Sequence, residues 1–250
     1  MKLACASSAF GREIENGELT QLEFLDLCAH ELACDGVVLD VRHFPRVDAD
    51  YLAQIKKMAT DWGLTIAALS DASLFKADDS YVERIFDHAV TLGAPLIAAP
   101  LCSETECSWT QQLTRLGAAT SLAKAANVTL ALRNAPSTFA NSTHDCKRVV
   151  KETDSAWLRY GPDPAALDGA SDPRALAPNT VLLWTRVRAA EPQTITAAQA
   201  FTRFRGFVAL DEPGEDADVR LAGIALREWR DTLCRAAKRN STTDSVLPTR

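Results

Sequence analysis

Short apolar runs alternate with longer amphipathic stretches along almost the whole chain. The clearest run begins at Val128 and reads VTLAL, and it leads directly into Arg133, Asn134 and a loop that contains Pro136. An apolar run of this length that ends at a turn signal is typical of a buried parallel strand. Because Arg133 follows a buried strand, its charge requires a ligand, an ion pair or solvent at the strand exit.

Eight strands of this kind are expected, each followed by a loop and a helical pattern. The expected strands cover residues 2–6, 37–41, 65–69, 95–99, 128–132, 157–160, 180–184 and 206–210. The expected helices cover residues 19–33, 48–62, 80–92, 109–126, 143–152, 165–176, 196–204 and 218–239, with a polar loop at 7–18. Thr20, Asp48 and Thr143 are predicted to cap the starts of helices, and Gly63 and Gly93 to end them.

Regular strand–helix alternation implies parallel strands joined by right-handed crossovers. Eight units in 250 residues predict a single (β/α)8 barrel over residues 1–239. A doubly wound open sheet is the alternative, but no GxGxxG or GxxxxGK(S/T) follows the first strand. Residues 240–250 are polar, without apolar periodicity, and are expected to form a disordered tail.

The composition is that of an ordinary globular protein, with 47% hydrophobic and 24% charged residues. A formal net charge of -6 and scattered basic residues argue against binding to nucleic acid or to an anionic membrane surface. No apolar window approaches the roughly 20 residues of a membrane span, and the N-terminus lacks the apolar core of a secretory signal. The seven cysteines show no paired CxxC spacing, which indicates free thiols in a reducing cytosol. We therefore expect a cytoplasmic protein.

In a barrel of this kind the active site lies at the carboxyl ends of the strands. His43 follows the second strand, where it could be a general acid or base, a donor to a substrate hydroxyl, or a loop residue packed under Phe44 and Pro45. Asp163 lies between two prolines and could bind a ligand or cap the next helix. Trp184, at a strand end, could line a pocket or belong to the core.

Several segments together resemble the xylose isomerase-like barrel superfamily, in its sugar-phosphate isomerase/epimerase branch. They are DGVVL at residues 35–39, YL at 51–52, GLTI at 63–66, VTLAL at 128–132 and GFVAL at 206–210. The resemblance covers nearly the whole chain and is one of pattern, without a unique motif. It implies a xylose isomerase-like (β/α)8 barrel that acts on a sugar or a sugar phosphate.

The resemblance also implies a divalent metal held by a Glu ending the fifth strand, an Asp after the sixth, a His or similar residue near the seventh and a Glu ending the eighth. The matching positions in this chain are Arg133, Asp163, a seventh strand without His, and Asp211. Two unit charges about 4 Å apart repel by roughly 4 kcal/mol at an effective dielectric constant of 20. We therefore expect no metal cofactor, with Arg133 in the cation's place and paired with Asp163 or Asp211.

Two functions follow. The first is a sugar isomerase or epimerase, in which His43, Asp71 or Asp211 is the base and Arg133 stabilises an enediolate oxygen. The second is a non-catalytic or degenerate barrel that binds an anionic sugar-like ligand through arginines at the strand exits. Either function makes a small carbohydrate-like molecule the expected partner and leaves the oligomeric state open. The residues expected to contact it are Arg42, Asn134, Asp163, Trp184, Arg186 and Glu212.

Overall fold

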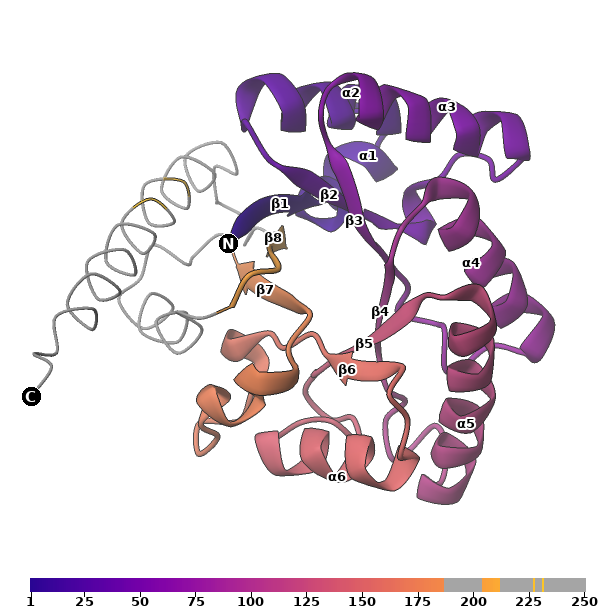
Figure 1. Cartoon of the computed structure of the whole chain (residues 1–250), viewed down its shortest axis with the longest axis vertical. Coiled ribbons are helices and arrows are strands. Elements are labelled where there is room, and N and C mark those ends of the chain that lie inside the picture. Colours follow the sequence, from indigo (N-terminus) through magenta and orange to yellow (C-terminus); the bar gives the residue numbers. More distant parts are fainter. Residues whose placement is uncertain (187–203, 212–226, 228–230, 232–250) are drawn as a thin grey trace, which may run out of the picture.

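The computed structural model describes residues 1–186, 204–211, 227 and 231, and shows eight parallel strands surrounded by helices (Figure 1). The strands are β1 (Lys2–Ala6), β2 (Gly36–Asp40), β3 (Thr65–Ser70), β4 (Leu96–Pro100), β5 (Thr129–Arg133), β6 (Leu158–Tyr160), β7 (Leu182–Arg186) and β8 (Phe207–Asp211). Their order in the sheet is β6-β5-β4-β3-β2-β1-β8-β7, and every paired register is parallel.

The two ends of this sheet, β6 and β7, meet and bring it to a nearly closed barrel. A parallel bridge joins Tyr160 to Thr180, and the Val181 amide donates to the Tyr160 carbonyl at 2.9 Å. The Trp184 amide donates to the Pro162 carbonyl, also at 2.9 Å. The predicted (β/α)8 barrel is therefore confirmed, and the open-sheet alternative is excluded.

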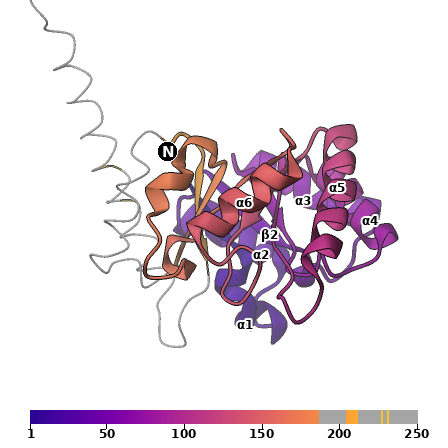
Figure 2. The ribbon, with the colours of Figure 1, turned by 90° about the horizontal axis from the view of Figure 1, so that it is seen from below.

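Helices cover the outside of the strands, as Figures 1 and 2 show from two directions. They are α1 (Gly11–Glu15), α2 (Gln21–Asp26), α3 (Ala49–Asp61), α4 (Asp79–Leu92), α5 (Trp109–Ala126) and α6 (Thr143–Thr153). Asp48 caps α3 through its side chain, and Gly63 follows with a φ of 73°, as predicted. Ser142 rather than Thr143 caps α6, because its hydroxyl accepts from the Asp145 amide in a capping box.

Two regions differ from the sequence prediction. The loop predicted at 7–18 contains a 3-10 turn, Ser7–Phe10, and α1, and the helix predicted at 19–33 is α2 followed by a π-helical turn, Leu27–Glu31. The helix predicted at 165–176 is replaced by two 3-10 segments, Pro164–Ala166 and Pro173–Asn179, each starting at a proline after a capping aspartate. The final two predicted helices and the predicted tail at 240–250 lie outside the described residues, apart from residues 204, 227 and 231. Within the described part of the chain, no helix combines the length and apolarity needed to cross a bilayer.

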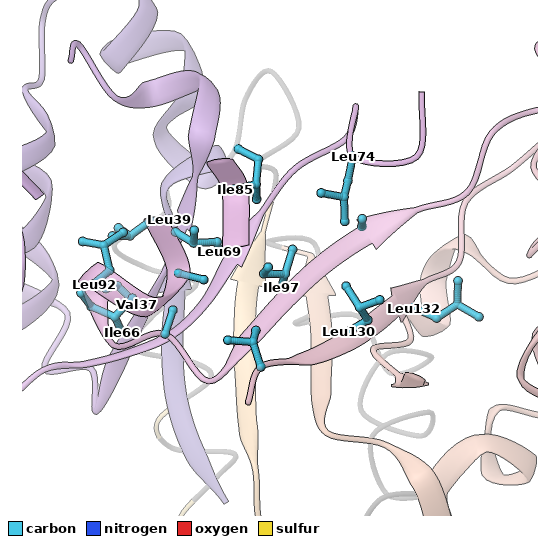
Figure 3. Close-up of a cluster of buried hydrophobic side chains, with 14 of the residues drawn as sticks. Val37, Leu39, Ile66, Leu69, Leu74, Ile85, Leu92, Ile97, Leu130 and Leu132 are labelled. Atoms are coloured by element: carbon cyan, nitrogen blue, oxygen red, sulfur yellow. The ribbon is translucent and has the colours of Figure 1, made fainter. Parts of the chain in front are cut away.

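The core has two layers, because alternate strand residues face opposite sides. Large aliphatic side chains such as Val37, Leu39 and Ile97 pack between the strands and the helices (Figure 3). The barrel interior is lined mainly by alanine, and Trp184 is the one aromatic side chain among its fully buried residues in the described part of the chain, with the partly buried Phe207 packed against them. The interior residues are Ala4, Ala6, Val38, Ala67, Ala68, Ala98, Ala131, Leu182, Trp184 and Ala209. The small side chains leave the space that the indole fills.

Candidate functional site

A cavity of about 310 Å³ opens at the carboxyl ends of the strands, and we call it the mouth cavity. It lies where the sequence placed the active site, and its volume falls in the range of about 300–1,000 Å³ that is usual for ligand pockets. The polar side chains that line it lie at the ends of strands or just after them. They are Ser8, Asp40, Arg42, Ser70, Arg133, Asn134, Asp163 and Asp211.

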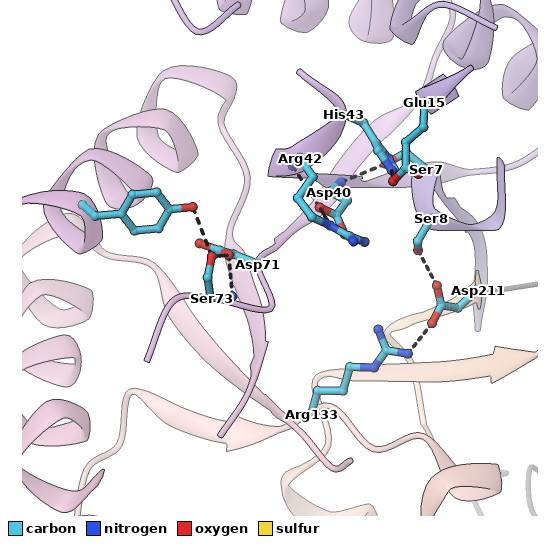
Figure 4. Close-up of polar contacts among 11 residues, drawn as sticks. Ser7, Ser8, Glu15, Asp40, Arg42, His43, Asp71, Ser73, Arg133 and Asp211 are labelled. Carbon is cyan, nitrogen blue, oxygen red and sulfur yellow. Dashed lines mark hydrogen bonds and ion pairs between the residues drawn. The ribbon is translucent and has the colours of Figure 1, made fainter. Parts of the chain in front are cut away.

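Arg133, the last residue of β5, forms ion pairs with two carboxylates of the mouth cavity. Its Nη2 donates to Asp211 Oδ2 (Figure 4). The same nitrogen lies 3.8 Å from Asp163 Oδ2. The other oxygen of Asp211 accepts a hydrogen bond from the Ser8 hydroxyl. The side chain of Arg133 is 20% exposed, whereas both carboxylates are almost fully buried. The ion pairs predicted for Arg133 are therefore present, and Asp211 gains a second partner from the loop after β1.

Trp184 lies beneath Arg133, with its ring centroid 4.1 Å from the guanidinium carbon. A guanidinium at this distance over an indole face is held by a cation–π interaction. Trp184 is 1% exposed, and its ring nitrogen donates to none of the described residues. Of the two roles that the sequence left open, the structure supports the core role, because the indole fills the barrel interior and does not line the mouth cavity.

A second carboxylate–guanidinium pair lies at the exit of β2. Asp40 Oδ1 accepts from the amide and Nε of Arg42 at 3.0 and 3.1 Å, and Asp40 Oδ2 accepts from Arg42 Nη2 at 3.0 Å. The hydrogen bond and charge of Asp40 raise the pKa of Arg42 above its ordinary value. Asp40 is not among the site residues predicted from the sequence, because the strand predicted at 37–41 includes it. The charged residue inside the run VVLDV was the available signal.

Asn134 acts on the protein backbone in this structure. Its Nδ2 donates to the Asp163 carbonyl at 3.0 Å, and its Oδ1 accepts from the Asp163 amide at 2.7 Å. Asp163 Oδ1 in turn accepts from the Ala165 amide at 3.0 Å, so Asp163 caps the following turn and also faces Arg133. Both atoms of the Asn134 amide are engaged and the residue is 1% exposed. It is a positioning residue that holds the Asp163 loop against β5.

His43 lies behind the mouth cavity and does not line it. Its side chain is 1% exposed, its Nδ1 lies 2.9 Å from the Ser7 hydroxyl, and its Nε2 lies 3.9 Å from Glu15. The Ser7 oxygen also accepts from the Asp40 amide at 2.9 Å, so Ser7 links the His43 ring to the end of β2. Burial lowers the pKa of His43. The geometry favours the packing alternative over the general acid or base.

Asp71 is also turned away from the mouth cavity. Its Oδ1 accepts from the amide and hydroxyl of Ser73 at 2.8 and 2.7 Å (Figure 4). The Ser73 hydroxyl also lies 3.4 Å from that of Tyr81. Asp71 is fully buried, and its Oδ2 accepts from no described residue. Arg186 ends β7, but its side chain lies outside the described residues, as does the whole of Glu212.

The donor set at the mouth does not suit a divalent cation. Hard cations such as Mg²⁺ and Mn²⁺ need several converging oxygen ligands of negative or neutral charge. At this mouth the guanidinium of Arg133 lies between the two carboxylates, Asp163 and Asp211, that would supply them. Within the described residues, no group of three His, Cys, Asp or Glu side chains is placed to hold a metal ion.

No protein-family model and no curated protein matches the chain. Several solved structures are similar in fold. An L-ribulose 3-epimerase has a TM-score of 0.72 at 16% identity, and the match covers 100% of this chain and 99% of that one. A D-psicose 3-epimerase from Clostridium cellulolyticum H10, solved with D-tagatose, has a TM-score of 0.71 at 14% identity over 97% and 99% of the two chains. A probable 3-DHS dehydratase from Bacillus anthracis has a TM-score of 0.71 at 14% identity over 92% and 98%.

These similarities confirm the xylose isomerase-like barrel fold that the sequence predicted. They extend over nearly the full length of each chain, so they concern the whole barrel rather than a shared segment. Sequence identities of 14–16% show a similarity of fold and no more. What this chain does must be argued from its own mouth cavity.

Proposed function

We propose that this protein binds a small, uncharged sugar-like polyol in the mouth cavity without the help of a divalent cation. The observation that supports this most directly is the position of Arg133 between Asp163 and Asp211. The guanidinium supplies positive charge and N–H donors at the place where a cation would otherwise hold a sugar oxygen. Its planar, fixed charge presents five donors, which suits recognition of several oxygens at once.

Charge favours an uncharged ligand over the anionic one expected from the sequence. The described lining residues include three carboxylates and two guanidinium groups, and each guanidinium is already paired with a carboxylate. An anion would have to displace a buried carboxylate from its partner, which breaks a charge-assisted hydrogen bond. A polyol can donate to the carboxylates and accept from the guanidinium groups while both pairs stay intact.

Turnover of the sugar, as an isomerase or epimerase, is the second candidate. It is favoured by the carboxylates that surround the cavity, and by solved structures of the same fold that are sugar 3-epimerases. Arg133 would stabilise an enediolate oxygen, and Asp211 would move a proton between carbon and solvent. In this structure both oxygens of Asp211 are engaged, by Arg133 and Ser8. The geometry therefore favours binding over turnover.

Calorimetry and thermal-shift measurements test the binding proposal. The probes are D-fructose, D-psicose, D-tagatose and L-ribulose, each with EDTA and with added Mn²⁺. We expect at least one sugar to bind equally well in both conditions and to lose its binding in Arg133→Ala. The control is Arg174→Ala, which removes an arginine paired with Asp172 outside the cavity. Binding that disappears with EDTA and returns with Mn²⁺ would refute the proposal.

Proton NMR in D2O distinguishes binding from turnover. An isomerase or epimerase removes a proton from a carbon next to a carbonyl, so solvent deuterium would enter the sugar at that carbon. Incorporation that is lost in Asp211→Asn would establish the second candidate. Binding without incorporation, for every sugar that binds, would establish the first.

A further inference from the structure

A second cavity, of about 390 Å³, lies between the loops that follow β4 and β5, and we call it the outer cavity. Its lining includes Ser103, Glu104 and Thr105 from the first loop and 137–139 and Asn141 from the second, together with side chains from the starts of α5 and α6. An antiparallel bridge between Ser103 and Thr138 joins the two loops. The cavity therefore belongs to the same end of the barrel as the mouth cavity.

The two cavities share one loop. Ala135 and Pro136 line the mouth cavity, and Ser137, the next residue, lines the outer cavity. Consecutive Cα atoms are about 3.8 Å apart, so the two linings meet within a single peptide unit. Ser137 has a φ of 60°, in the left-handed region that residues other than glycine rarely adopt. This turn directs the loop from one cavity to the other.

The outer cavity has a rigid aromatic wall made by Trp109 and Phe139. Their rings meet edge to face, with centroids 5.4 Å apart and an interplanar angle of 62°. The guanidinium carbon of Arg148 lies 4.3 Å from the Trp109 ring, and the indole nitrogen donates to Glu152 at 2.9 Å. Arg148 Nε also donates to Glu152, at 2.8 Å. The indole is thus held on several sides before any ligand binds, which lowers the entropy cost of binding.

Polar groups surround this wall, and two of their side chains have no hydrogen-bond or ion-pair partner among the described residues. The side chains of Glu104 and Asn141 form no hydrogen bond or ion pair with any residue that the structure describes. One is an acceptor from the first loop, and the other offers both an acceptor and two donors from the second. An aromatic wall within a mainly polar lining suits a ligand that presents both C–H surfaces and hydroxyl groups.

We infer that the outer cavity binds a second, uncharged sugar unit of a ligand whose first unit occupies the mouth cavity. Apolar C–H surfaces of that unit contact Trp109 and Phe139, and its hydroxyl groups pair with Glu104 and Asn141. The charged lining residues are Glu104, Asp145 and Arg148, so an anionic unit gains no net attraction there. This inference rests on the proposed function and narrows its ligand to a disaccharide or a glycoside.

The test compares free sugars with linked sugars by calorimetry on the full chain. The probes are glucose, fructose and the ketoses named above, against cellobiose, maltose, isomaltose, sucrose and the methyl glucosides. At least one linked sugar is expected to bind more tightly than its free units. Asn141→Ala removes one neutral hydrogen bond, and Glu104→Gln replaces a charge-assisted hydrogen bond by a neutral one. Each variant is expected to weaken the binding of that linked sugar by up to about tenfold. The same variants leave the affinity for free sugars unchanged.

Two controls keep the outcomes separate. Glu83→Gln removes an exposed carboxylate of α4 outside both cavities and is expected to change neither affinity. Arg133→Ala is expected to abolish both kinds of binding. The binding of a second sugar unit is refuted if free sugars bind but no linked sugar binds more tightly. It is also refuted if Asn141→Ala and Glu104→Gln weaken the binding of free and linked sugars equally. In both cases the proposed function stands. If no probe binds at all, both the second unit and the proposed function are refuted.

Discussion

The guanidinium of Arg133 lies over the indole of Trp184, with 4.1 Å between the guanidinium carbon and the ring centroid. The same guanidinium reaches Asp211 and Asp163, so it joins the aromatic residue of the barrel interior to the carboxylates of the mouth cavity. Trp184 therefore supports the site from below, although it does not line the cavity. The indole that supports Arg133 comes from β7, which lies at one end of the sheet order, whereas β5 lies next to the other end. The two strands come near each other because the barrel closes between β6 and β7.

Removal of this indole should destabilise the protein strongly. Trp184 is surrounded by alanines that cannot expand to fill the vacated space. Trp184→Ala is expected to lower the free energy of unfolding by about 3–5 kcal/mol, measured by urea unfolding. Trp184→Phe keeps an aromatic face beneath Arg133 and should cost less. Equal losses for the two variants would show that the cavity left by the indole does not determine the cost.

Exchange of the guanidinium for a carboxylate should create a metal site. Arg133→Glu would place a third carboxylate beside Asp163 and Asp211 and remove the positive charge between them. We expect Mn²⁺ to raise the melting temperature of this variant and to leave that of the wild type unchanged. The matched control, Arg133→Gln, removes the charge without adding a ligand of negative charge. A stoichiometric, micromolar Mn²⁺ site in the wild type would contradict the role given to Arg133.

The Asn134 side chain should matter for stability through the Asp163 backbone. Asn134→Ala removes the acceptor of the buried Asp163 amide and one of the two donors to the Asp163 carbonyl, the other being the Ala166 amide. The loss of the acceptor for one buried amide costs about 1–3 kcal/mol, so urea unfolding should detect a clear loss. Asn141→Ala is the control, because its side chain bonds to no described residue and a change within about 0.5 kcal/mol is expected. Similar values for both variants would exclude the positioning role.

His43 should make the protein less stable in acid. Burial lowers its pKa below the ordinary value of 6.5, so the folded chain releases the proton more readily than the unfolded chain. The unfolded chain therefore binds more protons as the pH falls from about 6.5 through the folded pKa, and stability declines over that window. Above it both states are neutral and the contribution is constant. The charged groups nearest the ring are Asp40, Arg42 and Glu15.

The comparison variant for this prediction is His43→Asn, whose side-chain amide can replace Nδ1 as the partner of Ser7. Urea unfolding of both proteins between pH 8 and pH 5 isolates the histidine, since the carboxylates are common to both. The wild type is expected to lose more stability than the variant below about pH 6.5. Parallel pH profiles would show that His43 is not the group responsible.

Local pattern was sufficient for the strands and for several helix ends. The apolar run before Arg133 is β5, and Asp48 caps α3 as its spacing indicated. The hydrophobic pattern was wrong about one strand end and about one helix. The strand run VVLDV was extended by one residue, which hid Asp40 from the list of exits, and prolines divided the helix expected at 165–176.

The sequence by itself determined the barrel, because hydrophobic periodicity specifies which side of each strand is buried and the regular alternation with helices specifies parallel strands. It also identified Arg133 as a charge in need of a partner. Only the tertiary structure decided which partners it has, since Asp211 is 78 residues away and Ser8, which bonds to Asp211, is 203 residues from it. The direction of a side chain at a strand exit depends on the loop that follows it. Loops turned His43 and Asp71 away from the mouth cavity, and no local pattern encodes that choice. Asp40, in contrast, reaches the cavity as the last residue of β2.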